Sequence, residues 1–220
     1  MKEFSILCDF DGTITIEDTG VVALDNFSQG DWRHYDRLLE QDKISLEGCI
    51  ITQFEMLKGK KKEILELLQK KITIRCNIME FLEFCKLNEI PFIILSAGLD
   101  FVIEYFISKI AKSMEIPVYS PKTHYIHEKL NISFPNKIFN DSKNFKEDIV
   151  RKYMENSETI IYIGNGLSDF EAVRVADYSY VVKNTKLAKM CAREKIPFEE
   201  FEDFNEIITS ITKKYSQLIF

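Results

Sequence analysis

The stretch CDFDGT, residues 8–13, ends a short apolar run and turns it into an acidic segment. The run 4–8 (FSILC) shows no helical spacing of apolar residues, and its length is that of a buried strand. Asp9 and Asp11 follow two positions apart, which places both side chains on the same side of an extended backbone. The sequence therefore predicts a buried strand that presents two carboxylates at its carboxyl end.

Two later apolar runs end in small polar residues in the same way. The run 91–95 (PFIIL) leads into 96–98 (SAG), and the run 159–163 (TIIYI) leads into 164–169 (GNGLSD). Ligands of open α/β sheets bind outside the carboxyl ends of the strands. We therefore expect the three polar clusters to meet in one crevice.

Helical periodicity fills most of the remaining chain. Strands alternate with helical patterns, with a fourth strand at 178–182 and a strand or irregular hairpin within 117–134, whereas 19–71 contains helical spacing alone. This alternation predicts the α/β class, with a Rossmann-like three-layer core around a parallel sheet. The predicted core is 1–14 plus 76–220, and residues 15–75 form a helical cap domain.

The residue types in the expected crevice favour phosphate chemistry. The carboxylates have no His or Cys neighbours, which suits a hard, oxygen-binding cation such as Mg²⁺. Gly12 and Thr13, the 96–98 turn and the 164–166 turn are each expected to offer backbone N–H groups to an anion. Acidic groups, Mg²⁺ and an anion cradle together predict a small phosphorylated metabolite as the ligand.

Composition excludes several other functions. The chain of 220 residues has 29 Lys and Arg against 35 Asp and Glu, a net charge of −6, which argues against a nucleic-acid partner. No apolar run approaches the roughly 20 residues that span a bilayer, and the N-terminus lacks the pattern of a signal peptide, so no membrane association is expected. The five cysteines are scattered and include no C-x-x-C pair, which indicates a reduced, cytoplasmic protein.

Taken in order, these motifs resemble those of the haloacid dehalogenase superfamily of phosphatases. The resemblance covers essentially the whole chain and rests on CDFDGT, a Ser on a later strand, a Lys, and GNGLSD. The helical insertion is similar to the cap of the phosphoserine phosphatase-like branch. Within that branch, CDFDGTIT, EIPFIILSAGLDF and YIGNGLSDFEA look most like the methionine-salvage phosphatases that act on 2-hydroxy-3-keto-5-methylthiopentenyl-1-phosphate.

The resemblance assigns roles to the first two motifs. Asp9 matches the nucleophile that forms an aspartyl-phosphate, and Asp11 matches the general acid and base. Both also match metal ligands, Asp11 through its carbonyl oxygen. Ser96, with Ala97, matches the phosphate-binding motif, a role compatible with Ser96 also capping the next helix. Thr13, beside Gly12, fits a phosphate contact and a turn cap equally well.

The later motifs are less regular. Two lysines, Lys143 and Lys146, are candidates for the cation that offsets the charge of phosphate and nucleophile, and the spacing to Gly164 in the resembling enzymes favours Lys146. The family usually has G-D-x-x-x-D in the fourth motif, whereas this chain has Asn165 in place of the first Asp. An amide supplies an oxygen to Mg²⁺ without a charge, and Asp169 remains as a direct or water-mediated ligand.

These departures leave two alternatives open. Asn165 allows a catalytically impaired protein that binds a phosphate ligand without turning it over. Asp18 matches a substrate-binding acid of the resembling enzymes, but Thr52 lies near the place of the cap Arg that phosphoserine phosphatases use, which argues against phosphoserine as the substrate.

Four aromatic residues either line an apolar cap surface or form the cap's own core: Phe27, Trp32, Tyr35 and Phe54.

Overall fold

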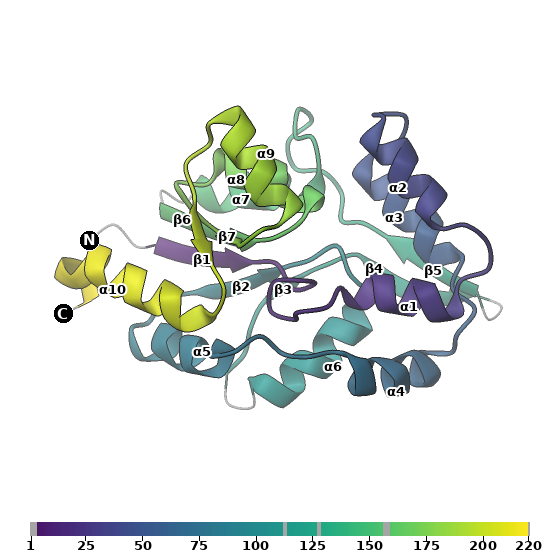
Figure 1. Ribbon diagram of the computed structural model, residues 1–220, viewed down its shortest axis with the longest axis horizontal. Helices are drawn as coiled ribbons and strands as arrows, with labels where there is room; N and C mark the ends of the chain where they lie inside the picture. Colours follow the sequence, from purple (N-terminus) through teal and green to yellow (C-terminus); the bar gives the residue numbers. More distant parts are fainter. Residues whose placement is uncertain (1–3, 112–113, 127–128, 156–158, 220) are drawn as a thin grey trace.

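A six-stranded sheet forms the centre of the computed structural model, which describes residues 4–111, 114–126, 129–155 and 159–219 (Figure 1). The strands follow the order β3-β2-β1-β6-β7-β8, and every neighbouring pair is parallel. Their bounds are β1 (Phe4–Cys8), β2 (Phe92–Leu95), β3 (Val118–Tyr119), β6 (Thr159–Gly164), β7 (Tyr178–Val182) and β8 (Glu199–Phe201). The predicted parallel α/β fold is therefore confirmed.

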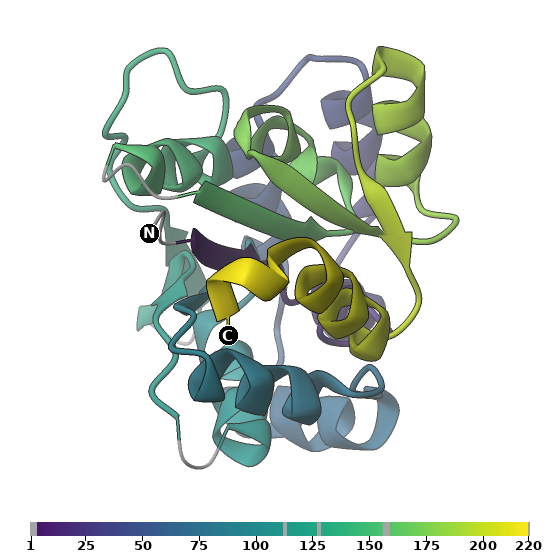
Figure 2. The ribbon, with the colours of Figure 1, turned by 90° about the vertical axis from the view of Figure 1, so that its left-hand side faces the viewer.

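Helices cover both faces of this sheet, so the strands are apolar along their whole length. Alternate side chains point to opposite faces: Ile6 and Cys8 belong to one hydrophobic cluster, and Leu7 belongs to the other. The first face carries α5 (Ile78–Leu87), α6 (Asp100–Ile110) and α10 (Phe204–Ile219); the second carries α7 (Phe145–Met154), α8 (Phe170–Val175) and α9 (Lys186–Glu194). Figure 2 shows the resulting three layers.

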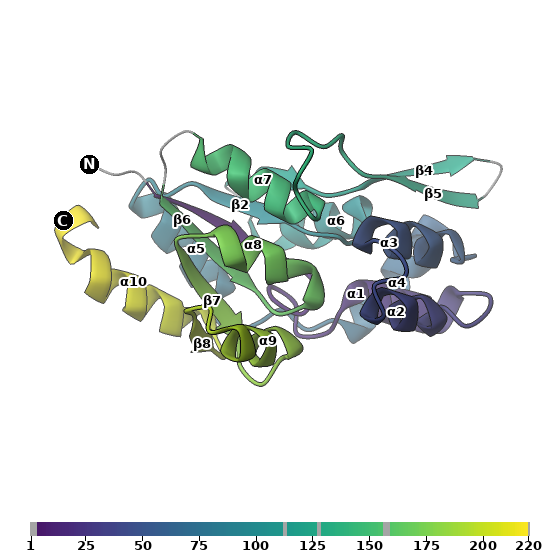
Figure 3. The same ribbon diagram turned by 90° about the horizontal axis from the view of Figure 1, so that it is seen from above.

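Four helices between β1 and α5 lie beyond the carboxyl ends of the strands (Figures 1 and 3). They are α1 (Thr19–Phe27), α2 (Arg33–Glu40), α3 (Leu46–Glu55) and α4 (Lys61–Lys71). The carboxylate of Asp18 and the hydroxyl of Ser45 accept hydrogen bonds from the first turns of α1 and α3, which fixes where these helices begin. Helix α2 packs on α3, and α1 packs on α4.

The chain leaves and re-enters the core through two segments that lie side by side. Ile16 N donates to Thr73 O at 2.9 Å, and Arg75 N donates to Ile14 O at 2.8 Å. The nearly buried Arg75 side chain also donates to the carbonyl oxygens of Thr13 and Gly12, at 2.6 and 2.7 Å. Arg75 thereby ties the re-entry point to the loop that carries the two aspartates.

The segment 117–134 contains an antiparallel hairpin of β4 (Lys122–Ile126) and β5 (Lys129–Ser133), apart from the main sheet. It extends beside the cap, and β5 packs on α3 (Figure 3). The predicted division into a core of 1–14 plus 76–220 and a cap of 15–75 stays a prediction. The hairpin belongs to the predicted core but contacts the predicted cap. None of the helices in the described ranges has the length and apolarity needed to cross a bilayer.

Candidate active site

Asp9 lies where the central strand β1 ends, between the neighbouring strands β2 and β6. Its backbone N–H donates to Ile163 O at 2.8 Å, which continues the sheet ladder by one residue. Its carboxylate is 4% exposed and receives a hydrogen bond from the Lys146 ammonium at 2.8 Å. Burial, followed by the nearby Asp169 charge, raises the pKa of Asp9 against the opposing effect of Lys146.

Lys146 is the cation of the site. Its side chain comes from the first turn of α7, is 0% exposed, and reaches Asp169 Oδ1 at 2.6 Å as well as Asp9. Burial opposes the charge on the ammonium, but the Asp169 and Asp9 carboxylates outweigh burial and raise the pKa of Lys146. Lys143 instead lies exposed on the surface, 3.9 Å from Glu171. The geometry therefore favours Lys146 for the predicted role.

Asp169 holds the fourth-motif turn in place. Tyr162 Oη donates to Asp169 Oδ1 at 2.7 Å, and the backbone N–H groups of Asn165 and Gly166 donate to Oδ2 at 2.9 and 2.8 Å. With Lys146, the carboxylate thus receives four hydrogen bonds. A Cβ on Gly164 would lie 2.7 Å from the Asp169 carboxyl carbon, so only glycine fits there. Direct metal ligation by Asp169 stays a prediction.

Asp11 is held by the cap and by the second motif. Thr19 at the start of α1 donates to Asp11 Oδ1 through its N–H at 2.9 Å and its hydroxyl at 2.5 Å. Ser96 Oγ donates to Oδ2 at 3.4 Å and accepts from Gly98 N at 3.0 Å. Burial raises the pKa of Asp11, and a raised pKa favours a carboxyl that carries a proton to a leaving group. A Cβ on Gly98 would meet Asp11 Oδ2 at 2.2 Å.

Asn165 lies against the first motif. Thr13 Oγ1 donates to Asn165 Oδ1 at 3.0 Å, so the Thr13 hydroxyl is engaged and its contact with phosphate stays a prediction. Gly12 has a φ of +73°, and a Cβ there would lie 2.1 Å from Asn165 Nδ2. Glycine is therefore required by both the backbone and the packing. Ligation of a cation by the side-chain oxygen of Asn165, which carries no charge, stays a prediction.

Oxygen donors gather at these loops, although no group of three or more His, Cys, Asp and Glu side chains among the described residues is arranged to hold a metal ion, so the cation stays a prediction. Asp9, Asp11 and Asp169 bring three carboxylates to one region, and Lys146 balances one of them. Two negative charges remain when all three acids are ionised and one remains when Asp11 is protonated, so a bound cation would offset the excess of negative charge. The oxygens of Asp9 and Asn165, with no His or Cys among the predicted ligands, match the ligand preference of Mg²⁺.

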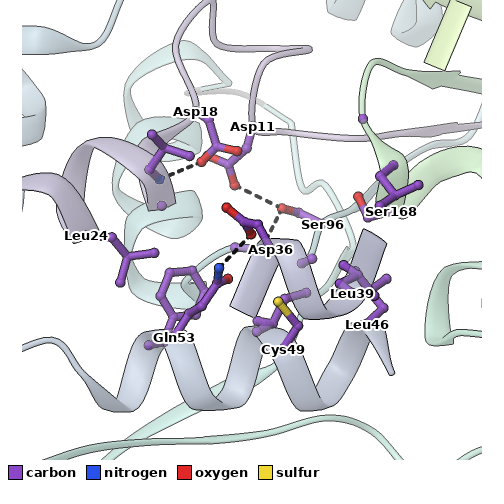
Figure 4. A pocket seen from close by; sticks show the side chains of 18 of the residues that line it. Asp11, Asp18, Leu24, Asp36, Leu39, Leu46, Cys49, Gln53, Ser96 and Ser168 are labelled. Carbon is purple, nitrogen blue, oxygen red and sulfur yellow. Dashed lines mark hydrogen bonds between the residues drawn. The ribbon is translucent and has the colours of Figure 1, made fainter. Parts of the chain in front are cut away.

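A cavity of about 280 Å³ opens between these loops and the cap (Figure 4). The core side includes Asp9, Asp11, Ser96, Ala97 and Asn165, all predicted site residues, and Asp18 lines it at the start of α1. Four other predicted site residues do not line the cavity and lie next to residues that do: Gly12, Thr13, Lys146 and Asp169. The cap side is mostly apolar: Val21, Leu24, Trp32, Leu39, Leu46, Cys49, Ile50 and Phe54, with Asp36, Glu40 and Gln53.

Several contributors were not predicted from the sequence. Of the four cap aromatics, Trp32 and Phe54 line the cavity, whereas Phe27 and Tyr35 do not. The sequence did not indicate that Asp36 and Gln53 belong to the site, because isolated polar residues in helices are ordinarily solvated. Thr19 could have been predicted as a contributor from the sequence. It directly follows the capping residue Asp18 and therefore presents its N–H at a helix start.

Comparison with known proteins identifies the family. The family model for haloacid dehalogenase-like hydrolases matches residues 6–174, which include all four motifs. The chain belongs to the haloacid dehalogenase-like hydrolase family. The predicted family membership is thereby confirmed, and with it the prediction that the protein is an enzyme of the hydrolase class.

Individual relatives of this haloacid dehalogenase-like hydrolase span its full length. A 2-hydroxy-3-keto-5-methylthiopentenyl-1-phosphate phosphatase of Brevibacillus brevis is 26% identical, with 99% of each chain covered. Pdp3-interacting factor 1 of Schizosaccharomyces pombe is 29% identical, with 97% of each covered. A solved phosphoserine phosphatase, described as a phospho-aspartyl intermediate analogue, superimposes with a TM-score of 0.71 at 18% identity, covering 96% of this chain and 99% of the other. That likeness establishes the fold.

Proposed function

We propose that this phosphatase hydrolyses a small phosphomonoester with Mg²⁺ through an aspartyl-phosphate on Asp9. The observation that carries the proposal is the placement of the Asp9 carboxylate. One of its oxygens is bound by the buried Lys146, and the residue lines the cavity beside Asp11 and Ser96. A buried carboxylate fixed in this way is positioned to attack, since its ammonium partner also offsets the charge of an incoming phosphate.

The reaction has two balanced steps. In the first, a carboxylate oxygen of Asp9 bonds to phosphorus as the bond to the leaving oxygen breaks, and Asp11 gives that oxygen its proton. In the second, Asp11 takes a proton from water, the water oxygen bonds to phosphorus, and the bond to Asp9 breaks. The raised pKa of Asp11 favours the protonated acid that the first step needs. Ser96 and Ala97 are proposed to bind the phosphate oxygens.

The charge of the site implies how the cation is held. Asp9, the Asp11 carbonyl and Asn165 are the proposed ligands, with Asp169 in direct or water-mediated contact. Mg²⁺ would supply positive charge against the phosphate oxygens. Thr13 holds the side-chain oxygen of Asn165 in place by a hydrogen bond, and Lys146 does the same for a carboxylate oxygen of Asp9.

The cavity supports a substrate with an apolar portion and without a carboxylate. Its cap wall carries Leu24, Leu39 and Phe54, and its lysine, Lys186, is already bound by Glu40 at 2.7 Å. A compound such as 2-hydroxy-3-keto-5-methylthiopentenyl-1-phosphate, on which several relatives are named as acting, fits this description. Phosphoserine fits it less well, because its carboxylate would find no free cation among the described lining residues.

The decisive test is phosphate release from an aryl phosphate and from both candidate substrates, by the native protein and by Asp9→Asn. The native protein is expected to turn over with Mg²⁺ and to stop in excess EDTA, and Asp9→Asn is expected to lose activity while remaining folded. More than a few per cent of residual activity in Asp9→Asn would refute the nucleophile. Tight phosphate-ester binding without any turnover would instead favour the impaired, binding-only protein that Asn165 allows.

A further inference from the structure

A polar pair interrupts the apolar wall of the cap. Asp36 on α2 and Gln53 on α3 line the cavity that Asp9, Asp11 and Ser96 also line, and Figure 4 shows the hydrogen bond between the two side chains. Gln53 Nε2 donates to Asp36 Oδ1 at 2.7 Å and to Trp32 O at 3.3 Å. The two residues therefore form one unit that links the facing helices.

The contacts of Gln53 fix the orientation of its amide. Nε2 donates one N–H to a carboxylate and the other to a carbonyl. In the flipped amide, Oε1 would face these two acceptor oxygens and could bind neither, so the orientation is fixed. Gln53 is 7% exposed, and within the described chain no donor is recorded for its Oε1 or for Asp36 Oδ2. Neither oxygen is cut off from solvent, since Ser120 Oγ is the one buried side-chain polar atom without a partner among the described residues. These two acceptors are left for a ligand.

The lining around the pair has an excess of negative charge. Asp18 and Asp36 line the cap side of the cavity without an ion-pair partner among the described residues, whereas Glu40 and Lys186 form an exposed ion pair with each other at 2.7 Å. A second anionic group on the ligand would therefore be repelled, and a donor would be attracted.

We propose that Asp36 and Gln53 determine specificity by binding a hydrogen-bond donor, a hydroxyl or an ammonium, on the leaving group of the substrate. This inference rests on the proposed function for the position of the phosphate at Asp9. It adds that the leaving group carries a donor beside its apolar part and carries no second anion. An analogue that lacks the donor would displace water from these acceptors without replacing its hydrogen bonds, and the site should therefore discriminate against it.

The test compares four phosphate esters of matched size: aminopropyl, hydroxypropyl, propyl and carboxyethyl phosphate. The kcat/KM for phosphate release is expected to be about tenfold or more higher for the first two than for propyl phosphate, and lowest for the carboxylate. Asp36→Asn should lower the aminopropyl value most, since it removes the charge and keeps an acceptor oxygen. Gln53→Met should lower the aminopropyl and hydroxypropyl values and spare propyl phosphate. Preference for aminopropyl over hydroxypropyl identifies an ammonium; the reverse identifies a hydroxyl.

A matched control and a second readout keep the result unambiguous. Asp42→Asn makes the same change at an exposed acid outside the cavity and should leave all four values unchanged. Calorimetric affinities of the four esters for Asp9→Asn measure the same preference without turnover. Equal affinity for propyl and hydroxypropyl or aminopropyl phosphate would overturn the proposal. Discrimination in binding with no hydrolysis by the native protein would refute the proposed reaction and leave this inference standing.

Discussion

At the residue scale, Asn165 is where the site departs from its family's usual pattern, and it contacts the first motif directly. Thr13 donates to its side-chain oxygen at 3.0 Å, and Gly12 leaves room for its amide nitrogen. A carboxylate at this position would keep the oxygen and the Thr13 hydrogen bond. It would add one more negative charge to a site whose carboxylates already outnumber its ammonium group, Lys146.

Asn165→Asp is therefore expected to tighten Mg²⁺ binding. Coulomb attraction at short range is worth several kcal/mol even at an effective dielectric constant near 20, and desolvation offsets most of it, which leaves about 1–3 kcal/mol. The Mg²⁺ concentration for half-maximal rate should fall roughly tenfold to a hundredfold. Turnover should slow, because the added charge opposes the phosphate. A Mg²⁺ titration of activity and of metal binding measures both effects, and an unchanged or weaker affinity would place Asn165 away from the metal.

Replacing Lys146 tests the opposite change, the removal of a positive charge from the site. Lys146→Met would leave the Asp9 and Asp169 carboxylates buried without their shared ammonium, and losing one partner of a buried ion pair costs about 3–5 kcal/mol. We expect a large drop in melting temperature in the absence of metal, together with loss of turnover. Lys143→Met is the matched control, since that lysine is exposed, and it should change neither. Equal effects of the two variants would contradict the assignment of Lys146.

At the scale of elements, cap and core are joined where helix α3 meets helix α7. Glu47 Oε1 of α3 accepts from Phe145 N, in the first turn of α7, at 2.8 Å. The next residue along α7 is Lys146. A carboxylate at a helix N-terminus is stabilising, so closure of the cap and placement of the lysine are expected to favour each other.

Glu47→Ala should accordingly weaken catalysis without unfolding the core. Loss of an acceptor at a helix N-terminus costs about 1 kcal/mol, which predicts roughly a fivefold fall in kcat/KM. Glu55→Ala removes an exposed acid of the same helix and serves as the control. Steady-state kinetics and melting curves of both variants provide the comparison. A fall in melting temperature with unchanged kinetics would make Glu47 a residue of stability alone.

The elements also show how far sequence patterns reach. The strands at 4–8, 92–95, 159–164 and 178–182 were predictable because they are continuously apolar and end in glycine or polar turns. Strand β8 (Glu199–Phe201) was not predicted, since two of its three residues are acidic and only Phe201 is buried. Its pairing with β7 comes from tertiary contact, which a period-two pattern over three residues cannot signal.

At the scale of the whole molecule, the core half of the site was predictable and the cap half was not. The rule that ligands bind at the carboxyl ends of parallel strands brings Asp9, Ser96 and Asn165 together before any coordinates exist. No comparable rule fixes how four helices pack above them. Asp36 and Gln53 meet only because α2 and α3 face each other, and Arg75 reaches the first motif only because the cap returns beside its starting point.

The same architecture predicts that Mg²⁺ stabilises the entire fold. The proposed ligands follow β1 and β6, and the carboxylates of Asp9, Asp11 and Asp169 outnumber the Lys146 ammonium of α7, so they repel one another in the folded state without the ion. A ligand that binds only the folded state at ten times its dissociation constant adds about 1.4 kcal/mol, which for a domain of this size raises the melting temperature by about 3–5 °C. Thermal unfolding in EDTA and in increasing Mg²⁺ measures this shift. Asp9→Asn lacks one ligand charge and should show a higher melting temperature in EDTA but a smaller rise with Mg²⁺. A native protein whose melting temperature ignores millimolar Mg²⁺ would show that the charge at the strand ends is balanced in another way.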